Sequence, residues 1–370
     1  MSARDRDMLT IRPWRNLYIH VPFCFRKCDY CAFYSEPDAA PLMRPWLDRI
    51  EHELTALSRV ELDTVYFGGG TPTLLPAEML EELFRAVEDL HSGAEEISIE
   101  CNPESLTEEK AAVLGQHVNR VSVGVQSFDP VLRKKIGRHG DPGRIRPAFE
   151  LLRGHGIENL GCDLIYGLPG QDLRAWEKDL REALTLPLKH LSAYSLTVEE
   201  GTPLSRRYAA DPACDERTAA MEKLTRRVLK EAGMKQYEIS NYARPGYECR
   251  HNRNVWHGET YLGLGPAACS FDGRDRFTQV SSLRAWLDGA EPETDVIPEA
   301  ARQAEMLIMG LRTIRGWAKG EFERVAGIAP EKLCPAQLAS LRRKKMMKKN
   351  GVVLTRRGLD FWNDAALELI

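Results

Sequence analysis

The sequence predicts an α/β protein whose parallel strands form a closed or partly closed (β/α) barrel, followed by a small, mainly helical C-terminal domain. The first observation is a series of short β-branched or aromatic runs that alternate with helical patterns. The second is that several runs are almost continuously apolar, as parallel strands covered on both faces are. The third is a change of pattern after about residue 290.

Six runs are predicted to be strands. They are LYIHV (17–21), TVYF (64–67), ISIE (97–100), VSVGV (121–125), LGCDLIY (160–166) and HLSAYSL (190–196). The clearest helix between them covers 76–91, where apolar residues share one stripe and Pro76 suits the first turn. A second helix follows Thr107, a good N-cap, and a third begins near Asp215.

The C-terminal part reads as a separate unit. A Pro-containing acidic stretch, GAEPETDVIPE (289–299), precedes mainly helical sequence, then VVLT (352–355) and a last helix. We therefore predict a barrel domain over 1–294 and a winged-helix-like domain over 295–370. Trp317 and Trp362 are its expected core anchors.

Composition narrows the classes of function. The 370 residues are 43% hydrophobic, and 51 basic against 54 acidic residues give a net charge of −3. With this balance of charges, the protein as a whole has no positive electrostatic potential that would attract nucleic acid. The apolar stretches are far too short to span a bilayer, and the start, MSARDRDMLTIRPWR, lacks a secretory h-region. We expect a cytoplasmic protein.

Three cysteines crowd into the loop after the first predicted strand. HVPFCFRKCDYC (20–31) places Cys24, Cys28 and Cys31 at metal-site spacing, where barrel enzymes build their sites. Three thiolates on a four-iron cluster leave one iron open to chelate a small molecule. A zinc site, which wants a fourth ligand, and a chance grouping are the alternatives. The other six cysteines are predicted to be buried apolar side chains: Cys101, Cys162, Cys214, Cys249, Cys269 and Cys334.

Polar residues follow the ends of the next strands. Gly68-Gly69-Gly70-Thr71 follows TVYF, and glycine lets a backbone come close to a ligand, although a tight βα turn would explain it equally. Four more polar side chains should converge on the same mouth, namely Glu100, Gln126, Arg138 and Asp163. Taken singly, each could instead be a helix cap or an ion-pair partner.

The Cys-x3-Cys-x2-Cys spacing resembles the radical SAM superfamily. In that superfamily the open iron of a [4Fe–4S] cluster binds the amino and carboxylate groups of S-adenosylmethionine, and GGGTPT faces the methionyl amine. The resemblance implies a nucleoside-binding set made of Tyr18, Tyr30, Gly69, Gly70, Thr71, Glu100, Gln126, Arg138 and Asp163. Packing alone would also account for the two tyrosines.

Longer motifs resemble the anaerobic coproporphyrinogen III oxidase family over nearly the whole chain. They are LYIHVPFC, GGGTPT, IECNPES, RVSVGVQSF, DLIYGLPGQ, SAYSLTVEEGTPL and YEISNYARPGYECRHN. The oxidase branch has a fourth cysteine where this chain has Phe33, and it has a longer N-terminal extension. Both features favour the haem-chaperone branch, whose members bind haem and pass it to respiratory acceptors. The rival is an oxidative decarboxylase of coproporphyrinogen III that acts through a 5′-deoxyadenosyl radical.

A haem ligand is implied by the same resemblance. The segment HNRNVW (251–256) is similar to the HNxxYW motif of the chaperone branch, which makes His251 the expected axial ligand, with Trp256 beside the macrocycle. Val255 replaces the motif tyrosine, and Cys269 stands where relatives have histidine, although its thiolate could itself ligate iron. A buried structural histidine is the alternative.

The basic cluster RRKKMMKKN (342–350) has several readings. It could touch DNA phosphates from a winged module, or it could be a solvated helix face. Contact with an acidic partner protein or a membrane surface fits equally. With the overall acidic balance we expect no nucleic-acid partner. The expected partners are haem and a haem-accepting protein, at the membrane surface if the basic cluster is used.

Overall fold

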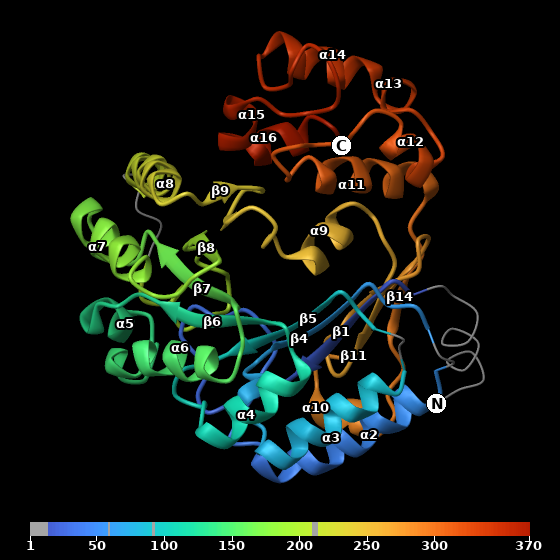
Figure 1. The fold of residues 1–370 in the computed structure, drawn as a ribbon. Helices are drawn as coiled ribbons and strands as arrows, with labels where there is room; N and C mark the ends of the chain where they lie inside the picture. The colour runs from blue at the N-terminus through green and yellow to red at the C-terminus, as the bar shows by residue number, and fades with distance from the viewer. Residues whose placement is uncertain (1–13, 58–59, 91–92, 209–213) are drawn as a thin grey trace.

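The computed structural model describes residues 14–57, 60–90, 93–208 and 214–370, and a curved sheet with helices on its outer face forms its centre (Figure 1). Six strands pair in parallel and in chain order: β1 (Asn16–Val21), β4 (Thr64–Gly69), β5 (Glu96–Cys101), β6 (Arg120–Gln126), β7 (Asn159–Tyr166) and β8 (His190–Ser195). All six predicted strands are confirmed. Their parallel order brings their carboxyl ends to one mouth.

Further strands extend the sheet at both edges. β11 (Tyr261–Leu264) pairs in parallel with β1, and β12 (Cys269–Phe271), β13 (Arg276–Thr278) and β14 (Glu293–Asp295) follow antiparallel. Beside β8 lie β10 (Asn241–Ala243) and β9 (Lys235–Gln236). Within the described ranges the hydrogen-bonded order ends at β14 and β9. Of the two predicted forms, the partly closed barrel is therefore the one observed.

Helices cover the outer face of this sheet (Figure 1). They are α2 (Met43–Thr55), α3 (Ala77–Glu88), α4 (Glu108–His117), α5 (Pro130–Lys135), α6 (Ile145–Gly154), α7 (Leu173–Ala183) and α8 (Cys214–Glu231). Thr107 caps α4 as predicted, since its side chain accepts the Lys110 N–H. Pro76 is the N-cap residue of α3 and so precedes the first turn in which it was predicted to lie.

Side chains alternate along the parallel strands. On β6, Val121, Val123 and Val125 are fully buried beneath the helices, whereas Arg120 and Ser122 face the concave side. The strands are thus buried on both faces, as expected, but the inner face is polar. This polar lining is what positions the site described below.

The C-terminal helices have a hydrophobic core of their own. They are α11 (Glu299–Gly310), α12 (Glu321–Ala326), α13 (Pro330–Leu333), α14 (Pro335–Arg343), α15 (Arg356–Asp360) and α16 (Trp362–Leu367). The core includes Trp317 and Phe322, and Trp362 packs against it. At VVLT (352–355), isolated antiparallel bridges form, such as Trp317 with Val352, where a winged-helix-like domain would have a pair of strands. The boundary near 295 stays a prediction.

The N-terminal segment 1–13, on which the expectation of a short, leaderless start depends, lies outside the described residues. Among the helices that the structure describes, none combines the length and the apolar character needed to cross a bilayer.

Candidate cluster and nucleoside site

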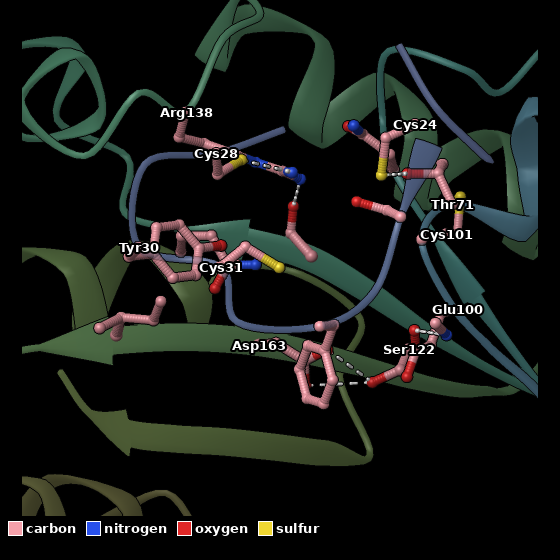
Figure 2. A pocket seen from close by; sticks show the side chains of 18 of the residues that line it. Cys24, Cys28, Tyr30, Cys31, Thr71, Glu100, Cys101, Ser122, Arg138 and Asp163 are labelled. Atoms are coloured by element: carbon pink, nitrogen blue, oxygen red, sulfur yellow. Dashed lines mark hydrogen bonds between the residues drawn. The ribbon is translucent and has the colours of Figure 1, made fainter. Parts of the chain in front are cut away.

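The loop after β1 brings the three predicted cysteines together at the mouth of the barrel. Cys24, Cys28 and Cys31 are free, partly exposed thiols, and all three line one cavity of about 810 Å3 (Figure 2). Two short contacts shape this cluster loop (residues 24–33). The Cys31 N–H donates to the Cys28 carbonyl at 3.2 Å, and the Asp29 N–H donates to the carbonyl at the end of α5.

Three soft thiolate donors on one loop are the kind of ligand that iron–sulfur clusters take. Within the described part of the chain, no three His, Cys, Asp or Glu side chains gather closely enough to hold one metal ion. Zinc also accepts thiolates, so the choice between a cluster and a zinc site stays a prediction.

Arg138 lies beside the cluster loop. Its Nη1 lies 3.9 Å from Cys28 Sγ, and its Nη2 donates to the Gly124 carbonyl (Figure 2). The guanidinium therefore brings a positive charge next to the cluster loop. On the other side, Cys24 Sγ lies 3.7 Å from Thr71 Oγ1.

Glu100 projects from the end of β5 into the cavity wall. Its Oε1 accepts the Tyr66 hydroxyl at 3.0 Å, and its Oε2 accepts the Gly69 N–H at 3.1 Å. Burial raises the pKa of Glu100 to about 7, with the nearby charge of Asp163 adding to the effect. The carboxylate keeps free lone pairs, which could accept ribose hydroxyls.

Asp163 stands on β7, two strands away. Both of its carboxylate oxygens lie 3.1 Å from Ser122 Oγ, and both residues line the cavity (Figure 2). Burial raises the pKa of Asp163 above its usual value. The second carboxylate thus faces the same space as Glu100 and is oriented by a hydroxyl.

Gln126 reaches the cavity through an irregular backbone. The residue has φ of 71°, in the left-handed region, and the β6–β7 register shifts between Gly124 and Gln126. Left-handed conformations are costly for residues with a side chain and gather at functional sites. A Cβ at Gly124 would lie 3.1 Å from the Gln126 amide nitrogen and 3.3 Å from Arg138.

The glycines at the end of β4 are required by the protein's own packing. Gly69 has φ of +109°, and a Cβ there would lie 2.6 Å from the His20 ring. A Cβ on Gly70 would lie 2.7 Å from the Phe23 carbonyl oxygen. Because the Gly69 N–H already donates to Glu100, this turn positions a carboxylate in addition to leaving room for a ligand.

Eleven predicted site residues meet around the cavity. They are Cys24, Cys28, Tyr30, Cys31, Gly69, Gly70, Thr71, Glu100, Gln126, Arg138 and Asp163. Tyr18 and His251 are not in its lining. The Tyr18 hydroxyl lies 3.2 Å from His20 Nδ1, and a role for Tyr18 in binding the nucleoside stays a prediction.

His251 lies inside the barrel, on α9 (Arg250–Trp256). Its side chain is enclosed, with 6% of the residue exposed, and its Nδ1 lies 2.8 Å from Thr64 Oγ1. Thr64 begins β4, whereas Gly69, by the cluster loop, ends it. His251 and the cluster loop are thus at opposite ends of this strand. Burial lowers the pKa of His251 to about 3, which keeps the imidazole neutral. The Glu96 carboxylate accepts the N–H groups of Arg250 and His251 and so fixes the start of α9.

The other residues tied to haem lie elsewhere. The Trp256 ring has the Arg312 guanidinium 5.3 Å from its centroid, which connects α9 to the C-terminal helices. Cys269 Sγ lies 3.7 Å from Thr278 Oγ1 on the neighbouring strand, and Cys269 is not a cavity residue. Haem ligation by His251 or Cys269 stays a prediction.

Several cavity residues were missed from the sequence. Arg120, Ser122 and Gly124 line the inner face of β6, and His190 and Ser192 line that of β8. The signal was the alternation in RVSVGVQ, where every second residue is polar or small. The strand was predicted from its valines, so the polar positions between them were overlooked.

Comparison with known proteins agrees with this geometry. Residues 18–183 match the family model described as the radical SAM superfamily. The solved structure "Coproporphyrinogen III oxidase (HemN) from Escherichia coli is a Radical SAM enzyme" superposes with a TM-score of 0.83, covering 97% of this chain and 90% of that chain at 20% identity. That likeness shows the fold. The barrel, the cysteine loop and the family match define a radical SAM protein.

Curated relatives narrow the class further. The chain is 32% identical to "Heme chaperone HemW" of Lactococcus lactis over 94% of this chain and 95% of that protein. It is 33% identical to the Bacillus subtilis protein of that name, over 93% and 96%, and 34% identical to the Escherichia coli K12 protein, over 87% and 89%. The chain belongs to the HemW family of radical SAM proteins.

Proposed function

We propose that this protein is a haem chaperone that holds a [4Fe–4S] cluster and S-adenosylmethionine in its barrel, binds haem and transfers it to an acceptor protein. The observation that supports it most is the convergence of three free thiols, Arg138 and two half-buried carboxylates on one cavity, in a chain of the HemW family.

In this proposal Cys24, Cys28 and Cys31 each bind one iron of the cluster, which leaves the fourth iron for the amino and carboxylate groups of S-adenosylmethionine. The bound cluster supplies a site for one-electron chemistry. Arg138 Nη1 lies 3.9 Å from Cys28 Sγ, and Phe33 occupies the position where the oxidase branch has a fourth cysteine. The proposed role of the cluster is to bind S-adenosylmethionine, and this role does not require that the sulfonium be cleaved.

The nucleoside is held by groups on successive strands. Glu100 accepts the ribose hydroxyls in its ionised form, and its geometry is set by Tyr66 and Gly69. Asp163 and Gln126 contribute further polar contacts from the cavity wall. Tyr30 offers an aromatic face next to the cysteines.

The runner-up activity is oxygen-independent coproporphyrinogen III oxidation, in which propionate side chains become vinyl groups. Phe33 favours the chaperone, because the oxidase branch has a cysteine at this position. The Phe33 side chain lines the cavity and is 70% exposed. We also propose a cytoplasmic location and a respiratory acceptor at the membrane surface, approached through the basic segment 342–350.

One pair of anaerobic assays separates the two activities. Reconstituted protein is mixed with haem, and separately with coproporphyrinogen III, S-adenosylmethionine and a reductant. The proposal expects a Soret band that titrates to one haem per chain, loss of that haem to an apo-acceptor, and no protoporphyrinogen IX. Protoporphyrinogen IX formation at multiple turnovers, or no haem binding, would contradict it.

A further inference from the structure

Two phenylalanines of the cluster loop are left in solvent at the cavity mouth. Phe25 is 80% exposed and Phe33 is 70% exposed, and both line the cavity that also holds the three cysteines. Large aromatic side chains standing in water at the rim of a cavity mark a surface that an apolar ligand covers. Nothing in the nucleoside site uses these rings.

Two cations lie between these phenylalanines in the chain. Arg26 and Lys27 line the same cavity, and neither forms an ion pair with a described carboxylate. Glu104 and Glu199 also belong to the lining, but Glu104 already accepts the Asp141 N–H at 2.9 Å. The cluster loop therefore presents apolar surface and positive charge side by side.

A free imidazole completes the rim. His139 follows Arg138, is exposed and lines the cavity, and its ring makes no hydrogen bond to another described residue. His251, by contrast, is enclosed by Thr64 and by the Tyr66 ring, whose centroid is 5.1 Å from that of His251. A ligand that arrives from solvent can reach His139 without displacing any packed side chain.

We propose that haem docks over this mouth, with its macrocycle against Phe25 and Phe33, its propionates toward Arg26 and Lys27, and His139 as its axial imidazole. The inference rests on the proposed function and adds the place of binding. A flat apolar ring with two carboxylates at one edge and a central iron matches the three kinds of group that gather here. Haem then covers the entrance through which S-adenosylmethionine enters and leaves.

Haem titration of the full-length, cluster-reconstituted protein tests the aromatic contacts. The variant Phe25→Ser/Phe33→Ser should raise the haem Kd at least about tenfold, because two apolar rings lose their contact with the ligand. The matched control is Phe361→Ser, since Phe361 is 52% exposed but lies between α15 and α16. Phe361→Ser should leave the Kd unchanged. Iron content is measured in each sample to confirm that the cluster is retained.

A second variant keeps the test decisive if the serine substitutions disturb the cluster. Arg26→Gln/Lys27→Gln should weaken haem binding in a manner that high salt reproduces in the wild type. Equal haem affinity in the wild type and in both loop variants would overturn the proposed docking site. A wild type that binds no haem would instead contradict the proposed function.

The axial ligand is read from the spectrum. His139→Ala should shift the Soret band of the complex, and His52→Ala, an exposed histidine on α2, should not. A shift in His251→Ala with none in His139→Ala would overturn the assignment of His139. As a further readout, bound haem should slow the release of labelled S-adenosylmethionine. Unaltered release would contradict a shared mouth.

Discussion

Burial and ionisation oppose each other at Glu100. Removing the carboxyl group from water disfavours its charged form, and the donors Tyr66 and Gly69 offset only part of that cost. Because its pKa rises from 4.5 to about 7, the native state binds this proton more tightly than the unfolded chain does. The neutral Glu100 carboxyl therefore makes its full contribution to the stability of the fold below pH 4.5. This contribution is lost as the pH rises through about 7.

Binding of S-adenosylmethionine should follow the opposite trend. If ionised Glu100 accepts the ribose hydroxyls, the affinity should increase by about tenfold between pH 6 and pH 8, in proportion to the ionised fraction of a group with pKa near 7. Equilibrium dialysis at several pH values measures the change.

The matched variant is Glu100→Gln, which keeps the shape but cannot ionise. It should bind weakly, with a flat profile across this range. A wild-type affinity that does not change with pH would show that Glu100 is not the ribose acceptor.

Eleven of the residues predicted from the sequence line the cavity, for two physical reasons. Cysteine spacing is a local property, and carboxyl ends of parallel strands always share an edge, so Glu100 and Asp163 could be placed together. Tyr18 and His251 lie outside the lining of the cavity, and the face that such a ring occupies depends on partners far along the chain. Thr64, which lies against His251, is 187 positions away from it.

At the scale of elements, the turn after β4 packs closely against the start of the cluster loop because its glycines have no side chains. Gly70 approaches the Phe23 carbonyl so closely that no Cβ can be placed, and its N–H donates to the Val21 carbonyl at 2.8 Å. The cluster loop begins directly after this contact.

We therefore expect Gly70→Ala to push the start of the cluster loop away from β4 and to reduce the iron bound per chain. The matched control is Gly154→Ala at the end of α6, where a Cβ meets nothing within 4 Å. That substitution should be neutral or stabilising by up to about 1 kcal/mol. Iron and sulfide analysis and thermal unfolding check both variants. Normal iron content in Gly70→Ala would contradict this role.

Elements were also where sequence patterns were least exact. The start of α3 was predicted one position early because Pro76 suits both the first turn and the cap. The bulge at Gln126 could not be predicted, since glutamine carries no preference for the left-handed backbone that it adopts there.

For the whole molecule, the barrel and the C-terminal helices meet through Arg312. Its guanidinium lies 3.1 Å from the fully buried carboxylate of Glu238, and its planar group lies over the rings of Trp256 and Trp362. Burial raises the pKa of Glu238, and Arg312 opposes that rise. The tryptophan of HNRNVW thus connects the two parts of the chain.

Arg312→Met should destabilise the fold by about 3–5 kcal/mol, because it leaves the Glu238 carboxylate buried without its partner. Urea unfolding at neutral pH measures the loss. The double variant Arg312→Met/Glu238→Gln should recover much of it, since no unpaired charge remains. If the single variant costs less than about 1 kcal/mol, the contact does not join the two parts.

The order of the barrel strands could be predicted, whereas the junction between barrel and C-terminal helices could not. Parallel strands joined by helices follow from periodicity alone, but β9 to β14 are each at most four residues long and give almost no periodic signal. The ion pair between Glu238 and Arg312 joins residues 74 positions apart, and no local sequence pattern predicts it.

The central claim is that the loop of three cysteines holds a four-iron cluster with one open coordination site. Anaerobic reconstitution followed by iron analysis and electron paramagnetic resonance, with and without S-adenosylmethionine, tests it directly. We predict about four irons per chain, a reduced-cluster signal that S-adenosylmethionine changes, and loss of both when Cys24, Cys28 and Cys31 are replaced by alanine. A chain that binds no cluster, or that keeps it after the triple replacement, would contradict the account.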